Sequence, residues 1–142
     1  MLSRRADYGV RAMVDMALQS PTTRSIVSEI AKRQDIPASF LAKIVPRLAR
    51  AGLVRTALGA GGGITLAAPP AEISLLQIIQ AIDGPLALNR CSLDPTNFRR
   101  HATCPACEVW RQAQTRLNET LEGTRLSDLV ARAQKNKSTK LH

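Results

Sequence analysis

The chain has 142 residues, of which 44% are apolar and 3% aromatic, and it carries a formal net charge of +9. This length excludes a string of several large domains, and an aliphatic core with so few aromatic residues favours packed helices over a β-sandwich. The sequence has no apolar run near the ~18 residues of a membrane-spanning helix and no signal-peptide pattern, so we expect a cytoplasmic protein without a membrane partner.

Two helices are predicted at the N-terminal end of the chain. Residues 4–19 are predicted to be helical, because apolar side chains recur along them at helical spacing. Pro21 ends this helix, since the residue before a proline is disfavoured in the helical region. Ser25 is a candidate N-cap for a second helix that ends at Arg33.

A third helix and a β-hairpin follow. The segment SFLAKIVPRLARAG predicts a helix that is capped by Ser39 and ends at Gly52. Pro46 lies inside this helix, removes one backbone hydrogen bond and is expected to kink it. The segment LVRTALGAGGGITLA then predicts two short strands joined by a glycine loop. The predicted inward side chains of the third helix are Leu41, Ile44, Val45 and Leu48.

The second half of the chain contains helices on either side of a cysteine-bearing loop. The segment SLLQIIQAIDG predicts a helix that stops at Gly84 and Pro85. A long helix is predicted from Glu108 to Glu122, in which Trp110 is expected to be a core or interface anchor. A last short helix, GTRLSDLVARAQ, precedes a basic tail, KNKSTKLH, which is expected to fray.

These elements predict a mainly α fold with a small β-hairpin, namely a winged helix-turn-helix followed by a long C-terminal helix. The expected divisions are a DNA-binding domain at 1–84, a cysteine loop at 85–107, the long and short C-terminal helices at 108–134, and a basic tail at 135–142.

Positive charge is segregated along the chain. Residues 1–60 contain ten Lys and Arg against four Asp and Glu, whereas residues 56–89 contain no Lys or Arg. A basic face favours double-stranded DNA as the partner, because phosphate neutralisation supplies affinity; a merely solubilising surface charge is the alternative. In a winged helix-turn-helix, the third helix enters the major groove and the hairpin follows the backbone. The candidate contact residues are Ser39, Lys43, Arg47 and Arg50 on the third helix, Arg55 on the hairpin, and Gly61, Gly62 and Gly63 in its loop.

The glycine loop permits positive φ values and a close approach of its backbone to DNA. Its sequence, GAGGGI, lacks the third glycine of a dinucleotide-binding motif and the Lys-Ser/Thr pair of a P-loop. A plain structural turn remains the alternative.

All the cysteines of the chain, Cys91, Cys104 and Cys107, lie within 17 residues. Thiols stay reduced in the cytoplasm, which favours metal binding or redox chemistry over a structural disulfide. The cysteines could bind zinc, or Cys104 and Cys107 could form a reversible disulfide, in a protein that still binds DNA. A thiol oxidoreductase is disfavoured because the CPAC motif lacks a strand-helix-strand context. No Ser-His-Asp or paired-carboxylate pattern is present, and we expect no enzymatic activity.

The segments DYGVRAMVDMA, IPASFLAKIVPRLARAGLV, GAGGGITLA, ISLLQIIQAIDG and RLSDLV, with the cysteine loop, cover nearly the whole chain. Together they resemble the Rrf family of bacterial winged-helix transcription regulators, the group that contains IscR, NsrR and RirA. The resemblance implies a homodimer built on the long helix after the cysteines, and therefore a palindromic operator. It also implies a regulator, expected to be a repressor, whose DNA affinity is controlled by an iron–sulfur cluster that senses nitric oxide, redox state or iron supply.

The resemblance implies Cys91, Cys104 and Cys107 as cluster ligands, and soft thiolates suit a cluster of the 2Fe–2S or the 4Fe–4S kind. The CPAC motif places Cys107 near a helix N-terminus, which favours the thiolate. In this family the fourth ligand can be a carboxylate of the partner protomer, and Asp7 is the matching position. Asp7 is alternatively a first-turn acid favoured by the helix dipole. His101 is a candidate substitute ligand, but a solvated loop histidine is the favoured interpretation. The spacing C-x12-C-x2-C departs from the more even spacing of family members with three cysteines.

Overall fold

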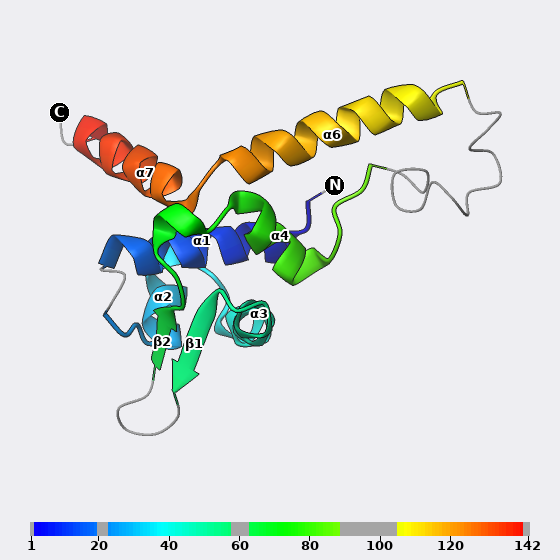
Figure 1. The fold of residues 1–142 in the computed structure, drawn as a ribbon. Coiled ribbons are helices and arrows are strands. Elements are labelled where there is room, and N and C mark those ends of the chain that lie inside the picture. Colours follow the sequence, from blue (N-terminus) through cyan, green and yellow to red (C-terminus); the bar gives the residue numbers. More distant parts are fainter. Residues whose placement is uncertain (1, 20–22, 58–62, 89–104, 141–142) are drawn as a thin grey trace.

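The computed structural model describes residues 2–19, 23–57, 63–88 and 105–140. Helices α1 (Arg4–Gln19), α2 (Val27–Gln34) and α3 (Ala38–Arg50) lie beside an antiparallel hairpin of β1 (Val54–Ala57) and β2 (Gly63–Leu66) (Figure 1). A 3-10 turn, η1 (Pro70–Glu72), leads into α4 (Leu75–Asp83). Helices α6 (Cys107–Gly123) and α7 (Leu126–Lys140) follow the cysteine loop.

One apolar core joins the N-terminal helices to the hairpin. Met13 of α1, Ile30 of α2 and Ile64 of β2 are almost completely buried in it. Val54 pairs with Leu66 across the hairpin, which puts both side chains against this core. The four predicted inward residues of α3 are all buried. The predicted mainly helical fold with a small hairpin is therefore confirmed, and it has the element order of a winged helix-turn-helix.

Two predicted helix caps are wrong. Ser25 does not cap α2: its backbone N–H donates to the Ile64 carbonyl at 2.9 Å, its carbonyl accepts from the Ile64 N–H at 2.8 Å, and α2 begins only at Val27. Ser39 lies inside α3, which begins at Ala38 with no side-chain cap. Ser25 instead extends the hairpin by an isolated bridge, because pairing both of its backbone groups outweighs a local cap.

Pro46 does not interrupt α3, which runs from Ala38 to Arg50. The missing N–H of Pro46 leaves the carbonyl of Ala42 without its helical partner. Both residues are exposed, so water can bind that carbonyl at little cost. Helix α3 thus tolerates a proline on the face that points away from the core.

The sequence predicted α4 well. Ser74 forms a capping box with Gln77, and Gly84 ends the helix with φ of +76°. The C-terminal helix differs from its prediction, because α7 continues to Lys140 and includes most of the segment expected to fray. No Gly or Pro occurs between Leu126 and Lys140 to stop it. Its first residue, Leu126, is fully buried, and its N–H donates to the Ile73 carbonyl at 2.8 Å.

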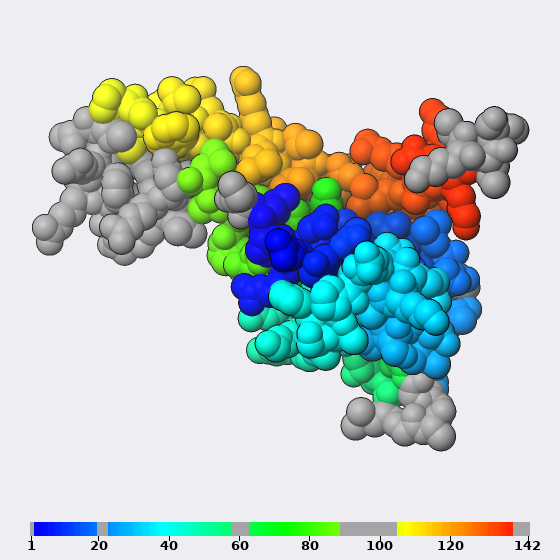
Figure 2. Space-filling view, turned by 180° about the vertical axis from the view of Figure 1, so that it is seen from behind, coloured from blue at the N-terminus to red at the C-terminus, as the bar shows by residue number. Residues whose placement is uncertain are grey.

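The N-terminal end of helix α6 projects away from the helical body (Figures 1 and 2). Its buried residues are Cys107 and Gln114. Val109 is 58% exposed and Trp110 is 42% exposed, so Trp110 is not an anchor of this chain's core. The interface role predicted for Trp110 is therefore the one that its exposure permits.

A buried ion pair joins α1 to α2 and sets a first stability prediction. The Asp15 side chain is 3% exposed; its carboxylate accepts from Arg33 Nη2 at 2.7 Å and from Gln34 Nε2 at 2.9 Å. The hydrogen bond to Asp15 raises the pKa of Arg33 above its usual value. We expect Asp15→Ala to lower the free energy of unfolding by about 2–3 kcal/mol, because the loss of a buried partner is costly even though Arg33 can still reach water.

Urea unfolding of the full chain, followed by circular dichroism, measures this loss. Glu29→Ala is the matched control, because Glu29 is an exposed partner of the same Arg33 at 3.9 Å. The control should change stability by only about 0.5 kcal/mol. Equal effects of the two substitutions would contradict a structural role for the buried pair.

Candidate nucleic-acid interface and metal centre

The solvent-facing side of α3 carries three of its four predicted contact residues. Ser39, Lys43 and Arg50 are exposed, on the side of the helix away from the buried apolar stripe. Lys43 lies in the first half of α3, and the N-terminal residues of a recognition helix are those that contact base edges. Arg47 differs: it is half-buried, and its Nη1 donates to the Ile82 carbonyl of α4 at 2.5 Å.

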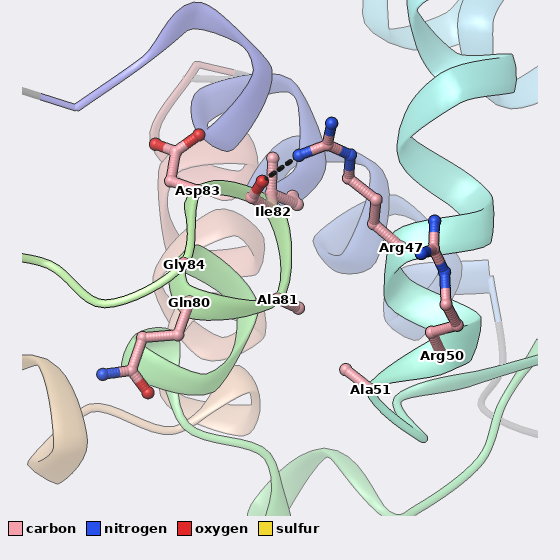
Figure 3. Close-up of a pocket in the computed structure, with 8 residues that line it drawn as sticks. All are labelled: Arg47, Arg50, Ala51, Gln80, Ala81, Ile82, Asp83 and Gly84. Carbon is pink, nitrogen blue, oxygen red and sulfur yellow. Dashed lines mark hydrogen bonds between the residues drawn. The ribbon is translucent and has the colours of Figure 1, made fainter.

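Arg47 and Arg50 line an open pocket of about 560 Å³ between α3 and α4 (Figure 3). The other wall is the last turn of α4, from Gln80 to Gly84. Carbonyl groups at the end of a helix are partly negative, so this wall attracts cations rather than anions. Arg47 therefore bridges α3 and α4 across this pocket. A phosphate could bind only on the side of the pocket that Arg50 lines.

Arg55 is exposed on β1, where it lies opposite Thr65 of β2. Gly63 has φ of +154°, and a Cβ on it would lie 2.9 Å from the Ser25 carbonyl oxygen. Glycine is thus required at this position for close backbone packing, whatever else it contacts. Gly61 and Gly62 lie outside the described residues.

Cys107 is the first residue of α6 and is 3% exposed. A helix N-terminus stabilises a thiolate, which is the form that binds metals. Cys91, Cys104 and His101 lie outside the described residues. Within the described ranges, no group of three or more His, Cys, Asp or Glu side chains could hold a metal ion. Any metal centre at Cys107 therefore needs ligands from the cysteine loop or from a second chain.

Asp7 lies in the first turn of α1 with its side chain 66% exposed. Arg11 Nε stands 3.4 Å from its carboxylate. The same guanidinium donates to the Gln34 carbonyl at 3.1 Å and lies 4.9 Å from the centre of the Tyr8 ring. Arg11 was not among the predicted site residues, although the i,i+4 spacing of Asp7 and Arg11 is a sequence signal for this pair.

Gln114 is a second residue that the sequence did not predict. Its side chain holds the start of the cysteine loop against α6: Oε1 accepts from the Leu88 N–H at 2.8 Å, and Nε2 donates to the Leu86 carbonyl at 2.7 Å. Nε2 also donates to Asn118 Oδ1 at 2.9 Å. Gln114 is 8% exposed, so this amide is a buried and well-satisfied polar group. A lone glutamine in a helix carries no sequence signal for such a contact.

No helix within the described ranges is long and apolar enough to cross a membrane. The exposed cationic side chains of α3 and β1 lie on the part of the molecule that carries the hairpin, whereas α6 and α7 lie at the other end (Figure 1). This arrangement separates the candidate DNA-binding face from the candidate metal centre.

Known proteins are similar to this chain over most of its length. Residues 2–132 match the Rrf2 family, described as "Iron-dependent Transcriptional regulator". A putative HTH-type transcriptional regulator of Neisseria meningitidis is 34% identical over 129 residues, which are 91% of this chain and 86% of that protein. The HTH-type transcriptional regulator IscR of Aliivibrio salmonicida is 30% identical over 129 residues, 91% of this chain and 76% of that protein.

Solved structures of regulators are also similar to this chain over most of its length. CymR of B. subtilis, described as the global cysteine regulator, has a TM-score of 0.75 at 25% identity and covers 92% of this chain and 96% of its own. IscR of T. potens has a TM-score of 0.75 at 28% identity and covers 94% of this chain and 88% of its own. The structural similarity therefore includes the N-terminal helices, the hairpin and the C-terminal helices α6 and α7 together.

Proposed function

Since this chain belongs to the Rrf2 family of transcriptional regulators, we propose that it is a DNA-binding repressor whose operator affinity is controlled by an iron–sulfur cluster. Membership of a family of regulators confirms that the chain is not an enzyme. The signal is nitric oxide, redox state or iron supply, and the cluster is of the 2Fe–2S or the 4Fe–4S kind.

The observation that carries this proposal is the position of Cys107. A buried thiol at the N-terminus of α6 is a soft donor whose thiolate the helix dipole stabilises. Gln114 of the same helix binds the backbone of Leu86 and Leu88, just before the segment that contains Cys91. Both ends of the cysteine loop are therefore anchored on one helix, which supports a loop that encloses a metal centre.

The donor chemistry fits an iron–sulfur cluster, and Cys91, Cys104 and Cys107 would hold it with Asp7 of the partner protomer. When bound, the cluster would supply a centre that nitric oxide, oxidants or iron shortage can alter. Asp7 is exposed on α1, and a carboxylate that reaches solvent is available to a second chain. Arg11 Nε lies 3.4 Å from this carboxylate and balances its charge.

The proposed partner of α6 is a second copy of this chain. Val109 and Trp110 leave an apolar surface on α6 that a symmetric partner helix would cover. Two winged helices related by a two-fold axis would bind a palindromic operator with half-sites about one DNA turn, ~10 bp, or a multiple of it apart. Ser39, Lys43, Arg50 and Arg55, with Gly61, Gly62 and Gly63 of the wing, would supply base, phosphate and backbone contacts.

One specific observation favours a second candidate function. The similar structures include CymR, the global cysteine regulator of B. subtilis, and an oxidised form of the Staphylococcus aureus protein of that name. In this alternative the chain keeps its DNA-binding surface but uses Cys104 and Cys107 for zinc or for a reversible disulfide, without a cluster.

Anaerobic purification followed by absorption spectroscopy and by iron, sulfide and zinc analysis separates these candidates. We expect brown protein that contains iron and acid-labile sulfide. An operator is then selected from a random duplex library, and its affinity is compared between cluster-loaded and cluster-free protein. Colourless protein with stoichiometric zinc would favour the second candidate, and equal operator affinity of the two forms would reject cluster control.

Asp7→Ala gives a prediction about the fourth ligand. We expect the fold and the oligomeric state to persist, because the exposed pair with Arg11 contributes little to stability. The half-life of the cluster in air should fall by about tenfold or more, since one ligand is lost. Glu29→Ala removes the same charge from the first turn of another helix and should not change that half-life. An unchanged half-life and spectrum in Asp7→Ala would return Asp7 to a dipole role and direct the same test to His101.

A further inference from the structure

Arg47 reaches from α3 across the pocket to the end of α4 (Figure 3). The last turn of α4 has no basic residue of its own. The guanidinium of Arg47 donates to the Ile82 carbonyl and so supplies the positive charge that the C-terminal end of that helix favours. Arg50 lines the same pocket but makes no hydrogen bond or ion pair with any described residue.

The turn that Arg47 holds is wedged between two other helices. Ile82 is 1% exposed, and a Cβ on Gly9 of α1 would collide with its Cδ1 atom. The same Cβ would lie 3.6 Å from Ile44 of α3, so α1, α3 and α4 meet here without spare volume. A displacement of the Ile82 side chain therefore changes its packing against α1.

The same turn also binds the start of α1. The Asp83 carboxylate accepts from Ser3 Oγ at 2.6 Å and from the Ser3 N–H at 3.3 Å. Ser3 Oγ in turn accepts from the Ala6 N–H at 3.0 Å, which caps the helix that carries Asp7. The end of α4 is thus fixed to the first turn of α1 as well as to the recognition helix.

The cysteine loop begins directly after this turn, at Pro85. Gly84 has φ of +76°, and the backbone at Leu86 and Leu88 is held by Gln114. Only Gly84 and Pro85 separate Asp83 from the segment that Gln114 holds against α6. At the end of α4, the hydrogen bond from Arg47 to the Ile82 carbonyl connects this turn to α3, the proposed recognition helix.

We propose that Arg47 is a positioning residue that couples the cysteine loop to the recognition helix. Its bond to the Ile82 carbonyl fixes α3 on the end of α4, so that a loop state which moves this turn also moves the helix that enters the DNA groove. This inference rests on the proposed function, in which the loop has two states. The operator shifts the balance between those states only by its different affinity for them.

Arg47→Met tests the coupling, because methionine keeps an unbranched apolar side chain and removes the donors. Arg50→Met is the matched control on the same helix and pocket. Operator affinity is measured for cluster-loaded and cluster-free protein of the wild type and of each variant, after cluster content is verified. We expect the two wild-type forms to differ by about tenfold or more, a ratio within the usual range of allosteric coupling.

In Arg47→Met this ratio should fall to about twofold or less, whereas Arg50→Met should weaken both forms together and keep the ratio. Equal weakening of both forms of Arg47→Met, with the ratio retained, would identify Arg47 as a plain DNA contact and overturn the proposal. Equal affinity of the two wild-type forms would overturn the proposed function, and with it a coupling role for Arg47.

A second measurement does not depend on the cluster. Amide hydrogen exchange of cluster-free protein reports the opening of α3 and of the last turn of α4. We expect Arg47→Met to raise exchange in residues 45–51 and 80–84 together, and Arg50→Met to leave residues 80–84 unchanged. Unchanged exchange of residues 80–84 in Arg47→Met would show that the bond does not hold the two helices, and would by itself overturn the coupling role.

Discussion

Cys107→Ala should yield colourless protein that has lost its iron and acid-labile sulfide. Cys107 is the buried donor at the N-terminus of α6, and a cluster that lacks one of its few thiolate ligands is exposed to solvent and oxygen. The expected loss of iron and sulfide is near complete, because Cys107 is the one proposed thiolate ligand that belongs to a helix, and the other proposed ligands come from the loop before α6 or from a second chain. Anaerobic purification, the visible absorption spectrum and iron and sulfide analysis measure it.

The control for this prediction separates ligand loss from misfolding. Cys107→Ser keeps the volume of the side chain and offers a hard oxygen in place of soft sulfur, so it too should lose most of the cluster. Thermal unfolding of the cluster-free forms of wild type and both variants should give midpoints within a few degrees of one another. Wild-type iron content in either variant would show that Cys107 is not a ligand.

Loss of the cluster should also remove the response of the protein to its signal. The operator affinity of Cys107→Ala should equal that of cluster-free wild type, and exposure to nitric oxide or to air should not change it. Linkage requires the converse effect in the wild type: operator DNA alters the stability of the cluster by the same factor by which the cluster alters operator affinity. A nitric oxide response in Cys107→Ala would place the sensor elsewhere in the chain.

Lys43→Ala should weaken operator binding by ~1–3 kcal/mol, which corresponds to roughly 5- to 150-fold in Kd. Lys43 is exposed in the middle of α3, opposite the buried stripe that anchors this helix. If the ammonium contacts a phosphate, the loss should be the same for all sequences and the slope of log K against log salt should fall by about one. If it contacts a base, the preference at one operator position should relax.

Fluorescence anisotropy on the selected operator and on a scrambled duplex, over a range of salt concentrations, distinguishes these outcomes. Lys137→Ala is the matched control, because Lys137 is an exposed lysine on α7, at the other end of the molecule from the hairpin (Figures 1 and 2). It should leave operator affinity within about twofold of the wild type. An unchanged Kd and salt slope in Lys43→Ala would show that this face of α3 is not the DNA-binding face.

The sequence by itself determined the order and type of the elements. Hydrophobic periodicity is a local property, and with the turn signals it predicted α1, α3, the hairpin and α4, whereas the Ser74 cap of α4 was seen only in the structure. It also predicted that Ser39, Lys43 and Arg55 face solvent, because the outward face of a helix or strand is the complement of its apolar stripe. The family resemblance followed from the same segments.

Local rules failed where a distant contact took precedence. Ser25 has the residue type of an N-cap, but its backbone pairs with Ile64 in the hairpin. The last helix was expected to end early because terminal segments tend to fray, yet nothing in that segment stops a helix once Leu126 and Val130 pack on the core.

Only the tertiary structure decided the contacts that connect the two candidate sites. Arg47 binds a carbonyl 35 residues away, Gln114 binds the loop stem 26 and 28 residues away, and Ser3 binds Asp83 across 80 residues. Propensity, capping and periodicity act over a turn or two of the chain, whereas these bonds require helices that packing brings together. Arg47 has the spacing of a DNA contact in the sequence, and its bond to α4 depends on the position of Ile82, which is buried against Gly9 of α1.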